Sequence, residues 1–276
     1  WEDLQKDSLY QDPNISKLMD AQIVYCGDEK YIEKLEELRL RVKNNLLEPL
    51  SKEDYIKAEN MMKEAEHCYL SAMVSENMAD IWAQAGDAIY YIENAIVMLN
   101  KKYFHFGTKR IYEELELMKN KPCQFCELIE NVLSSNSSEQ IKESFTILMQ
   151  ETVRTFKETK AAIQVEKKPV TAESIQGTYE EMYSNWRNKM HLSFNENNRH
   201  LAFMSMISLH AMISDVGMEV GIARYPVLEG YHPQDLKKTA MAFDNWINEY
   251  LQEYHKAGLQ VTRYQNIDEF VRNYLE

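Results

Sequence analysis

The chain has 276 residues, which is enough for one large domain or for two modest domains with separate cores. It carries 31 Lys and Arg residues against 44 Asp and Glu residues, and the formal net charge of −13 argues against general binding to nucleic acids or membrane surfaces, because polyanions are repelled. Four cysteines cannot form a disulfide framework in a chain of this length, so we expect a reducing compartment and a cytoplasmic protein.

Helix breakers are scarce: the chain has only 8 glycines and 6 prolines, whereas Glu, Lys, Leu, Met and Ala are abundant. This composition predicts a mainly α protein. No signal peptide opens the sequence and no apolar run approaches the roughly 18 residues of a membrane span, so we expect no contact with a membrane. The first residue is Trp1 rather than Met, and we expect further residues to precede it.

Strand-like sequence is confined to the first fifty residues. The runs "SLYQDP" and "AQIVYC" are rich in β-prone residues, and a turn-prone Asp12-Pro13-Asn14 separates them. The following "DEKYIEKLEELRLRVKNNLL" returns to a helical pattern. We therefore expect residues 1–50 to form a small α/β remnant in front of the helical part of the chain.

Residues 51–163 have the pattern of a helical domain. Ser51, with Asp54 three residues later, is typical of a helix N-cap. The next predicted helix has the most regular apolar spacing in the chain, in steps of three and four residues: Ile81, Ala85, Ala88, Ile92, Ala95, Leu99 and Tyr103. A second apolar stripe lies beside the first, so we expect this helix to be at the centre of the domain.

The segment "VEKKPVTAESIQGT" predicts a linker, because it combines a charge run with Pro169 and Gly177. Beyond it, three stretches with helical periodicity indicate a second helical bundle over residues 172–276. The predicted architecture is therefore mainly α, with two helical bundles following a small α/β N-terminal remnant.

Polar side chains interrupt the apolar faces of the predicted central helix. We consider five of them as a group: Asp87, Tyr90, Tyr91, Glu93 and Asn94. A helix covered on most sides must pair such groups or direct them into a cavity, because burying them unpaired is costly. The carboxylate of Asp87 or Glu93 could then act as a general base toward a substrate hydroxyl, with the Tyr and Asn side chains as substrate contacts. The alternative is ordinary hydrogen bonding between helices.

Positive charge is concentrated in "LNKKYFHFGTKR", where the central helix is expected to end. Lys101 and Lys102 suit the C-terminal end of a helix, where cations complement the dipole. Lys109 and Arg110 instead fall in the first turn expected for the next helix, where cations oppose the dipole. This misplacement indicates an anion site made of helix N–H groups and two cations beside aromatic residues.

Other motifs point to less chemistry. The "CQFC" pair, Cys123 and Cys126, lacks a second pair of metal ligands, so we expect an apolar helix face and assign no metal site. No glycine-rich phosphate loop is present. The stretch "RNKMH" is similar to the Arg-x4–6-His signature of HEPN-family ribonucleases, but only three residues separate Arg187 from His191. The alternative is a solvated basic face, and the acidic net charge makes nucleic acid an unexpected partner.

Two stretches carry a family resemblance. "LNKKYF" and "GTKRIYEELELMKNKP" resemble the helical substrate domain of the nucleotidyltransferase superfamily, which contains the lincosamide and kanamycin nucleotidyltransferases, and "SLYQDPNISKLMDAQ" resembles the end of its palm domain. The resemblance covers about residues 5–160, whereas residues 170–276 match only in being helical. The palm motif of that family, Gly-Ser followed by Asp-x-Asp, does not occur in this sequence. Either the palm domain lies upstream of this sequence or it has been lost, and the resemblance assigns no catalytic palm carboxylate here.

The resemblance implies a transferase that uses Mg²⁺ and a nucleoside triphosphate to modify a small hydroxylated acceptor. The helical domain would close over the nucleotide, and Asp87 or Glu93 would orient or deprotonate the acceptor. The residues expected at the nucleotide and its phosphates are Asn100, Lys101, Tyr103, Lys109 and Arg110. A non-catalytic helical interaction or regulatory module is the first alternative, and a HEPN-like ribonuclease is the second.

Overall fold

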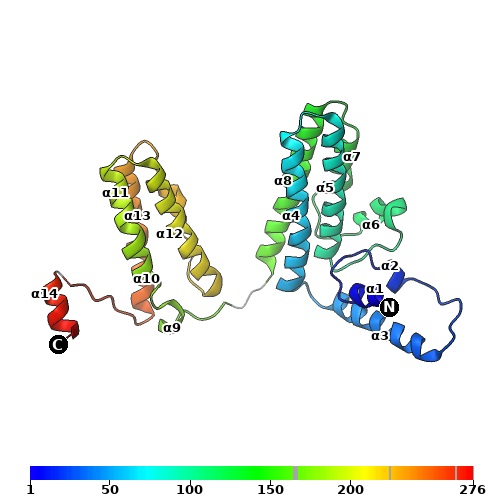
Figure 1. Cartoon of the computed structure of the whole chain (residues 1–276), viewed down its shortest axis with the longest axis horizontal. Helices are drawn as coiled ribbons and strands as arrows, with labels where there is room; N and C mark the ends of the chain where they lie inside the picture. Colours follow the sequence, from blue (N-terminus) through cyan, green and yellow to red (C-terminus); the bar gives the residue numbers. More distant parts are fainter. Residues whose placement is uncertain (164–166, 224, 265, 276) are drawn as a thin grey trace. The chain divides into compact units, whose positions relative to one another are not determined.

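The computed structural model describes residues 1–163, 167–223, 225–264 and 266–275, and all of its regular elements are helices (Figure 1). The chain divides into two compact units, Trp1–Val165 and Glu166–Glu276, each with its own hydrophobic core. The described residues contain no β-strand, and a single β-bridge joins two of them, Lys168 and Val220. The protein is therefore mainly α-helical, as its composition predicts.

The first unit is built around long helices, and Figure 1 shows α4, α5, α7 and α8 side by side with α1, α2 and α3 at one end of this group. Its elements are α1 (Glu2–Asp7), α2 (Ser16–Met19), α3 (Glu29–Leu47), α4 (Lys52–Val74), α5 (Met78–Leu99), η1 (Gly107–Arg110), α6 (Ile111–Glu116), α7 (Phe125–Leu133) and α8 (Ser138–Ala162).

Helix α5 lies in the centre of this unit, as its apolar periodicity predicts. The first apolar stripe is buried from Ile81 to Leu99, whereas Trp82 in the second stripe is half-buried, and the last seven residues of α5 are all buried. The neighbouring α4 begins after the expected N-cap: the Ser51 hydroxyl accepts from the Asp54 N–H, and the Asp54 carboxylate accepts from the Ser51 N–H. Fully buried alanines on the two helices let their backbones approach closely: Ala58, Ala65, Ala72, Ala85, Ala88 and Ala95.

The strands expected in the first fifty residues are not formed, so that prediction is wrong. Residues 8–13 form turns, and residues 21–26 have no regular structure, with Val24 96 % exposed. A β-prone segment becomes a strand only by pairing its backbone with a neighbouring strand, and the described residues provide none. Tyr10 and Leu38 instead belong to the same apolar core as α4 and α5.

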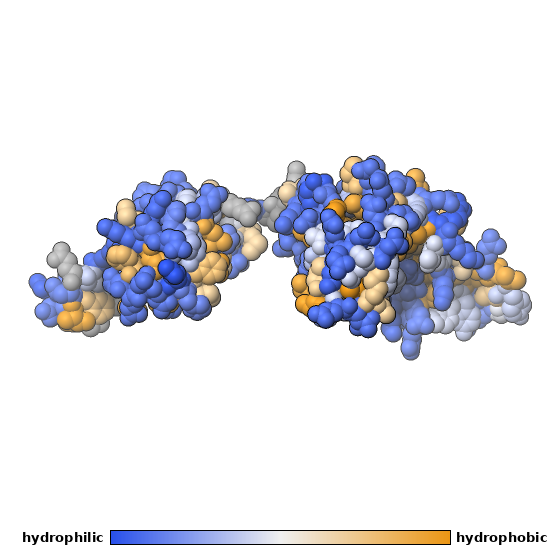
Figure 2. Space-filling model, turned by 90° about the horizontal axis from the view of Figure 1, so that it is seen from above, coloured by the Kyte–Doolittle hydropathy of each residue, from blue (hydrophilic) through white to orange (hydrophobic). Residues whose placement is uncertain are grey.

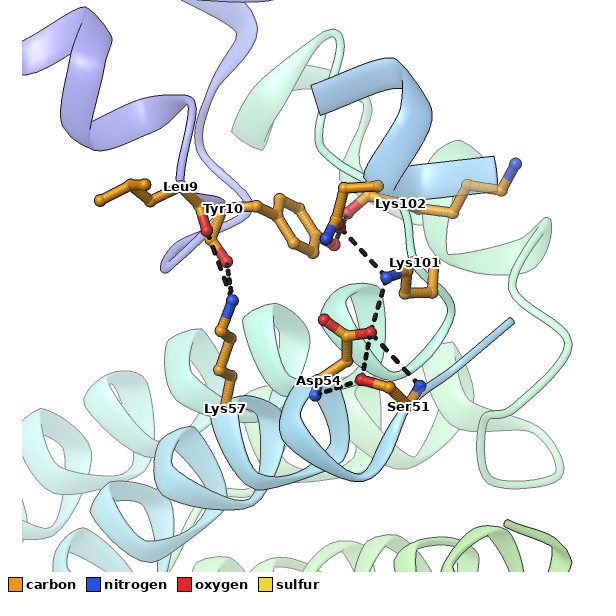
Figure 3. Close-up of polar contacts among 8 residues, drawn as sticks. Leu9, Tyr10, Ser51, Asp54, Lys57, Lys101 and Lys102 are labelled. Atoms are coloured by element: carbon orange, nitrogen blue, oxygen red, sulfur yellow. Dashed lines mark hydrogen bonds and ion pairs between the residues drawn. The ribbon is translucent and has the colours of Figure 1, made fainter. Parts of the chain in front are cut away.

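A buried ion pair joins three segments of the first unit (Figure 3). Lys101 Nζ, just beyond α5, donates to Asp54 Oδ2 at 2.6 Å and to Asn45 Oδ1 on α3 at 3.1 Å. Lys101 and Asp54 are each only 6 % exposed. Burial acts to raise the pKa of Asp54, but the hydrogen bonds from Lys101 and Ser51 outweigh it and hold that pKa below its usual range. Lys101 is thus a structural cation.

The second unit has two long helices, α12 and α13, and several short elements around a separate core. They are α9 (Ala172–Ile175), α10 (Thr178–Glu181), the π-helical η2 (Met182–Arg187), α11 (Asn188–Asn195), α12 (Arg199–Glu219), η3 (Val227–Gly230), α13 (Leu236–Lys256), α14 (Ile267–Phe270) and η4 (Val271–Leu275). Asn266 caps α14 by accepting from the Glu269 N–H. The first two residues of the predicted linker, Val165 and Glu166, lie outside the described residues.

Helix α12 is apolar around most of its circumference. By length and composition it could cross a membrane, since an 18-residue window reaches a mean hydropathy of 1.4, so the expectation that no segment approaches a membrane span is wrong. A core helix of a soluble protein passes the same test but is mostly buried, whereas 28 % of this window is buried. The buried side chains of α12 include Met206, Leu209 and Ile213 in the core of the second unit. Figure 2 shows that hydrophilic residues predominate on the visible face of each unit, and that small apolar areas lie among these residues.

Candidate functional site

A pocket of about 580 Å³ lies in the first unit, between α5, α7 and the segment that leads from α5 into α6. Residues from both regions singled out in the sequence line it. From α5 come Tyr90, Glu93 and Asn94, and from the basic stretch come Lys109 and Arg110. This volume is in the range of sites for small organic ligands.

Glu93 is the most unusual side chain in the pocket. It is 8 % exposed, and it makes no hydrogen bond or ion pair with any described residue. Burial raises the pKa of its carboxyl to about 7, because no cation compensates for the lost water. Glu93 can therefore take up or release a proton near neutral pH, which is what a general base or acid requires.

Gly86 lies on α5 two turns before Glu93 and also lines the pocket. A Cβ built at this position would have no other atom within 4 Å, so the space in front of the glycine is open. Because Gly86 has no side chain, the part of the pocket wall between Glu93 and the start of α5 stays open.

Tyr90 and Asn94 take part in hydrogen bonds that join α5 to the N-terminal segment. Asn14 Nδ2 donates to Asn94 Oδ1 at 2.8 Å and lies 3.5 Å from the Tyr90 hydroxyl, while Asn94 Nδ2 donates to the Tyr90 carbonyl at 2.7 Å. For Asn94 this is the expected alternative of hydrogen bonding between elements. The Tyr90 side chain is 50 % exposed and open to a ligand.

The segment carrying the cations is held by a buried carboxylate. Glu114 accepts from the backbone N–H groups of His105 at 2.7 Å and Phe106 at 2.9 Å. Gly107 follows with φ +62°, a left-handed conformation that glycine adopts without strain. Together these features turn the chain so that Lys109 and Arg110 reach the pocket.

The two cations differ in whether their charge is already paired with a carboxylate. Arg110 Nε donates to both carboxylate oxygens of Glu113, at 3.0 and 2.9 Å, and its Cζ lies 4.1 Å from the centroid of the Phe106 ring. Lys109 is exposed and has no hydrogen-bond or ion-pair partner among the described residues. Lys109 is therefore the cation that an anionic ligand would meet unpaired.

The expected helix N-terminus at these cations is not formed. Lys109 and Arg110 lie in the 3₁₀ turn η1, and α6 begins only at Ile111 and has six residues. Its first turn already contains Glu113 and Glu114, which satisfy the preference for negative charge there. An anion at this pocket would therefore depend on side-chain cations rather than on a helix dipole.

The other five candidate residues lie outside the pocket lining. Asp87 is exposed and Tyr91 is half-buried against the core, while Lys101 forms the ion pair described above. The Asn100 side chain accepts from the backbone N–H groups of Lys119 and Asn120, and the Tyr103 hydroxyl donates to Asp20 at 2.9 Å. The contacts of Tyr91, Asn100, Lys101 and Tyr103 are therefore structural ones.

Asn14 and Tyr112 are among the pocket residues that the sequence did not single out. Asn14 belongs to the segment between α1 and α2, and nothing near it indicates contact with a helix eighty residues away. Tyr112, in α6, donates from its hydroxyl to Glu130 Oε1 at 2.6 Å, and burial followed by this carboxylate raises the pKa of the phenol. A tyrosine beside two glutamates in an acidic helix gives no distinctive signal.

The described residues contain no group of three or more His, Cys, Asp or Glu side chains that could hold a metal ion. The resemblance places Mg²⁺ on the palm motif, which this sequence lacks, and we assign no residue of the pocket to that ion. At the "CQFC" pair, burial and the nearby Glu116 raise the pKa of the Cys126 thiol to about 11, so this thiol stays protonated and unreactive at neutral pH.

In the second unit, Arg187 and His191 meet at a carboxylate that the sequence did not reveal. Asp244 of α13 accepts from Arg187 Nε at 2.8 Å and lies 3.0 Å from His191 Nε2.

Comparison with protein-family models, with curated proteins and with solved structures finds no match. The nucleotidyltransferase resemblance therefore depends on the quoted sequence stretches alone.

Proposed function

We propose that this protein is nucleotidyltransferase-like and that its first unit holds a nucleotide with a small hydroxylated acceptor in the pocket between α5 and α6. The observation that carries the proposal is Glu93, a buried carboxyl group that faces a pocket of ligand size without a partner among the described residues. Keeping such a group unpaired costs stability, and this cost is typical of a site that a ligand completes.

Glu93 would act as the general base of this reaction. With a pKa of about 7, its ionised form accepts the proton of the acceptor hydroxyl as the acceptor oxygen bonds to the α-phosphorus and pyrophosphate leaves. Lys109 would contact the phosphates, because it is the unpaired cation of the pocket. Tyr90 would contact the acceptor or the base from the exposed side. Mg²⁺, which the resemblance implies, would neutralise phosphate charge from ligands supplied elsewhere.

The test is calorimetric titration of the chain with MgATP. We expect Lys109→Gln to weaken binding about tenfold, since a charge-assisted contact contributes roughly 1.5 kcal/mol. Lys102→Gln is the matched control, because Lys102 is an exposed lysine in the same segment but outside the pocket, and its affinity should equal that of the wild type. Gly86→Leu should abolish binding by filling the pocket.

Equal MgATP affinity in the wild type, Lys109→Gln and Gly86→Leu would show that the nucleotide binds elsewhere, and the proposal would then be wrong. Absence of MgATP binding to the wild-type chain would favour the non-catalytic helical module. The HEPN-like ribonuclease is less supported, because RNA affinity depends on many phosphate contacts and the chain has a net charge of −13.

A further inference from the structure

A cluster of cationic and aromatic side chains lies on the second unit, apart from the residues of the pocket. It consists of Tyr183, Arg187, His191, Asp244 and Arg263, and we call it the Tyr183 cluster. Two guanidinium groups lie near one aromatic ring: Arg187 Cζ is 5.1 Å and Arg263 Cζ 4.3 Å from the centroid of the Tyr183 ring.

Asp244 orders one side of the cluster. Its carboxylate accepts from Arg187 at 2.8 Å and lies 3.0 Å from His191 Nε2, so one carboxylate serves two basic side chains. Arg263 donates to the Tyr179 hydroxyl but forms no ion pair with a described residue. The nearby Glu180 accepts the Tyr254 hydroxyl at 2.6 Å. Arg263 therefore contributes a guanidinium charge that no carboxylate contacts directly.

The backbone beneath the cluster is unusual. Tyr183 and Arg187 both belong to η2, six residues of π-helix between the α-helical α10 and α11. π-Helical turns are rare and frequently occur at functional sites, because their wider hydrogen-bonding pattern costs stability. Here the wide turn presents Tyr183 and Arg187 together toward Arg263.

We infer that the Tyr183 cluster binds the phosphate group of a small phosphomonoester. Guanidinium groups match phosphate oxygens with paired N–H donors. Asp244 occupies Nε and Nη2 of Arg187, so Arg187 offers Nη1. Arg263, whose Nη2 contacts Tyr179, offers Nε and Nη1 on a partly exposed surface. His191, fixed through Nε2 by Asp244, adds a third polar contact. A compact dianion senses this local positive charge, whereas a long polyanion meets the acidic remainder of the chain.

This inference does not depend on the proposed nucleotidyltransferase activity, and its test follows the second unit directly. The intact chain, with Lys109→Gln to weaken the pocket of the first unit, is titrated with inorganic phosphate and with AMP at constant ionic strength. The imidazole ¹H–¹⁵N signals of His191, identified through His191→Gln, report binding at the cluster. We expect saturable shifts with both ligands. Equal affinities would indicate a receptor for phosphate itself, and tighter AMP binding would indicate an organic phosphomonoester.

Variants separate the cluster from general charge effects. Arg263→Gln removes an exposed side chain and should weaken binding at least tenfold without unfolding the protein, and Arg187→Gln should do the same. Lys189→Gln is the matched control, because Lys189 lies 4.0 Å over the Trp186 ring and not over Tyr183, and its affinity should change less than twofold.

Three results would overturn the inference. The first is the absence of a saturable His191 shift with either ligand. The second is unchanged affinity in both arginine variants. The third is binding of a single-stranded oligoribonucleotide without terminal phosphates at least as tightly as AMP, which would assign the cluster to nucleic acid instead.

Discussion

Two buried carboxylates in the first unit have opposite properties. Asp54 at the start of α4 and Glu93 in the middle of α5 are almost equally buried, at 6 % and 8 % exposure. Lys101 and Ser51 lower the pKa of Asp54, whereas burial alone raises the pKa of Glu93 to about 7. Burial therefore does not determine the charge state; the partners do. Asp54 stabilises the fold, and Glu93 is left available for a ligand.

Removing the partner of Asp54 should have the largest effect. Lys101→Met leaves a buried carboxylate unpaired, which typically costs about 3–5 kcal/mol of unfolding free energy, measurable by urea denaturation at pH 7. The wild-type pair should also lose its contribution as the pH falls through the lowered pKa of Asp54, since the unfolded state binds a proton there first. A loss below 1 kcal/mol in Lys101→Met would mean that the ion pair is not buried.

Removing the charge of Glu93 should increase the free energy of unfolding above neutral pH, in contrast to Lys101→Met. The folded carboxyl holds its proton more tightly than the unfolded one, whose pKa is near 4.5, so the wild type loses about 3 kcal/mol of stability between pH 4 and pH 8. Glu93→Gln lacks this loss. The difference in unfolding free energy between variant and wild type should therefore grow by about 3 kcal/mol in favour of the variant over that range, and a constant difference would contradict the raised pKa.

A change at the N-cap of α4 tests the second partner of Asp54, the Ser51 side chain. Ser51→Ala removes the hydroxyl that accepts from the Asp54 N–H and contacts Oδ2 at 2.8 Å, and it should cost about 1–2 kcal/mol. Thermal unfolding by circular dichroism measures this loss. Ser51→Thr retains the hydroxyl and should recover most of the stability, whereas equal losses in both variants would point to packing instead.

Gly86 gives the smallest expected effect, and it is stabilising. Gly86→Ala fills open space in the interior of α5 and should add about 0.5–1 kcal/mol, because alanine loses less backbone entropy in a helix. Urea denaturation at pH 7 provides the measurement. Destabilisation would mean that the wall in front of Glu93 is already occupied.

The sequence predicted local features well and long-range pairing poorly. The Ser51 cap with Asp54 and the apolar stripe of α5 depend on neighbours within one or two turns, and both are confirmed. The sequence also singled out Glu93 and Lys109, because a carboxylate on an apolar helix and a cation before an acidic helix stand out locally. Whether they act as proposed stays a prediction.

What could not be predicted depends on contacts between distant segments. The sequence pattern places Lys101 at the end of a helix, but it does not reveal that Lys101 pairs with Asp54, forty-seven residues away. Asn14 meets Asn94 across eighty residues, and the β-prone run at residues 21–26 has no strand to pair with in the described part of the chain. Periodicity and propensity carry no information about such pairings.

Hydrogen bonds attach the N-terminal segment to the helices of the first unit, so this segment cannot be removed without loss of contacts. The Tyr10 hydroxyl donates to the Lys102 carbonyl, and Lys57 Nζ lies within hydrogen-bond distance of the Leu9 and Tyr10 carbonyls (Figure 3). A truncated fragment starting at α4 would expose the underside of the bundle and take away the Asn14 edge of the pocket. Expression clones intended to retain ligand binding should therefore keep the chain from its first helix onward.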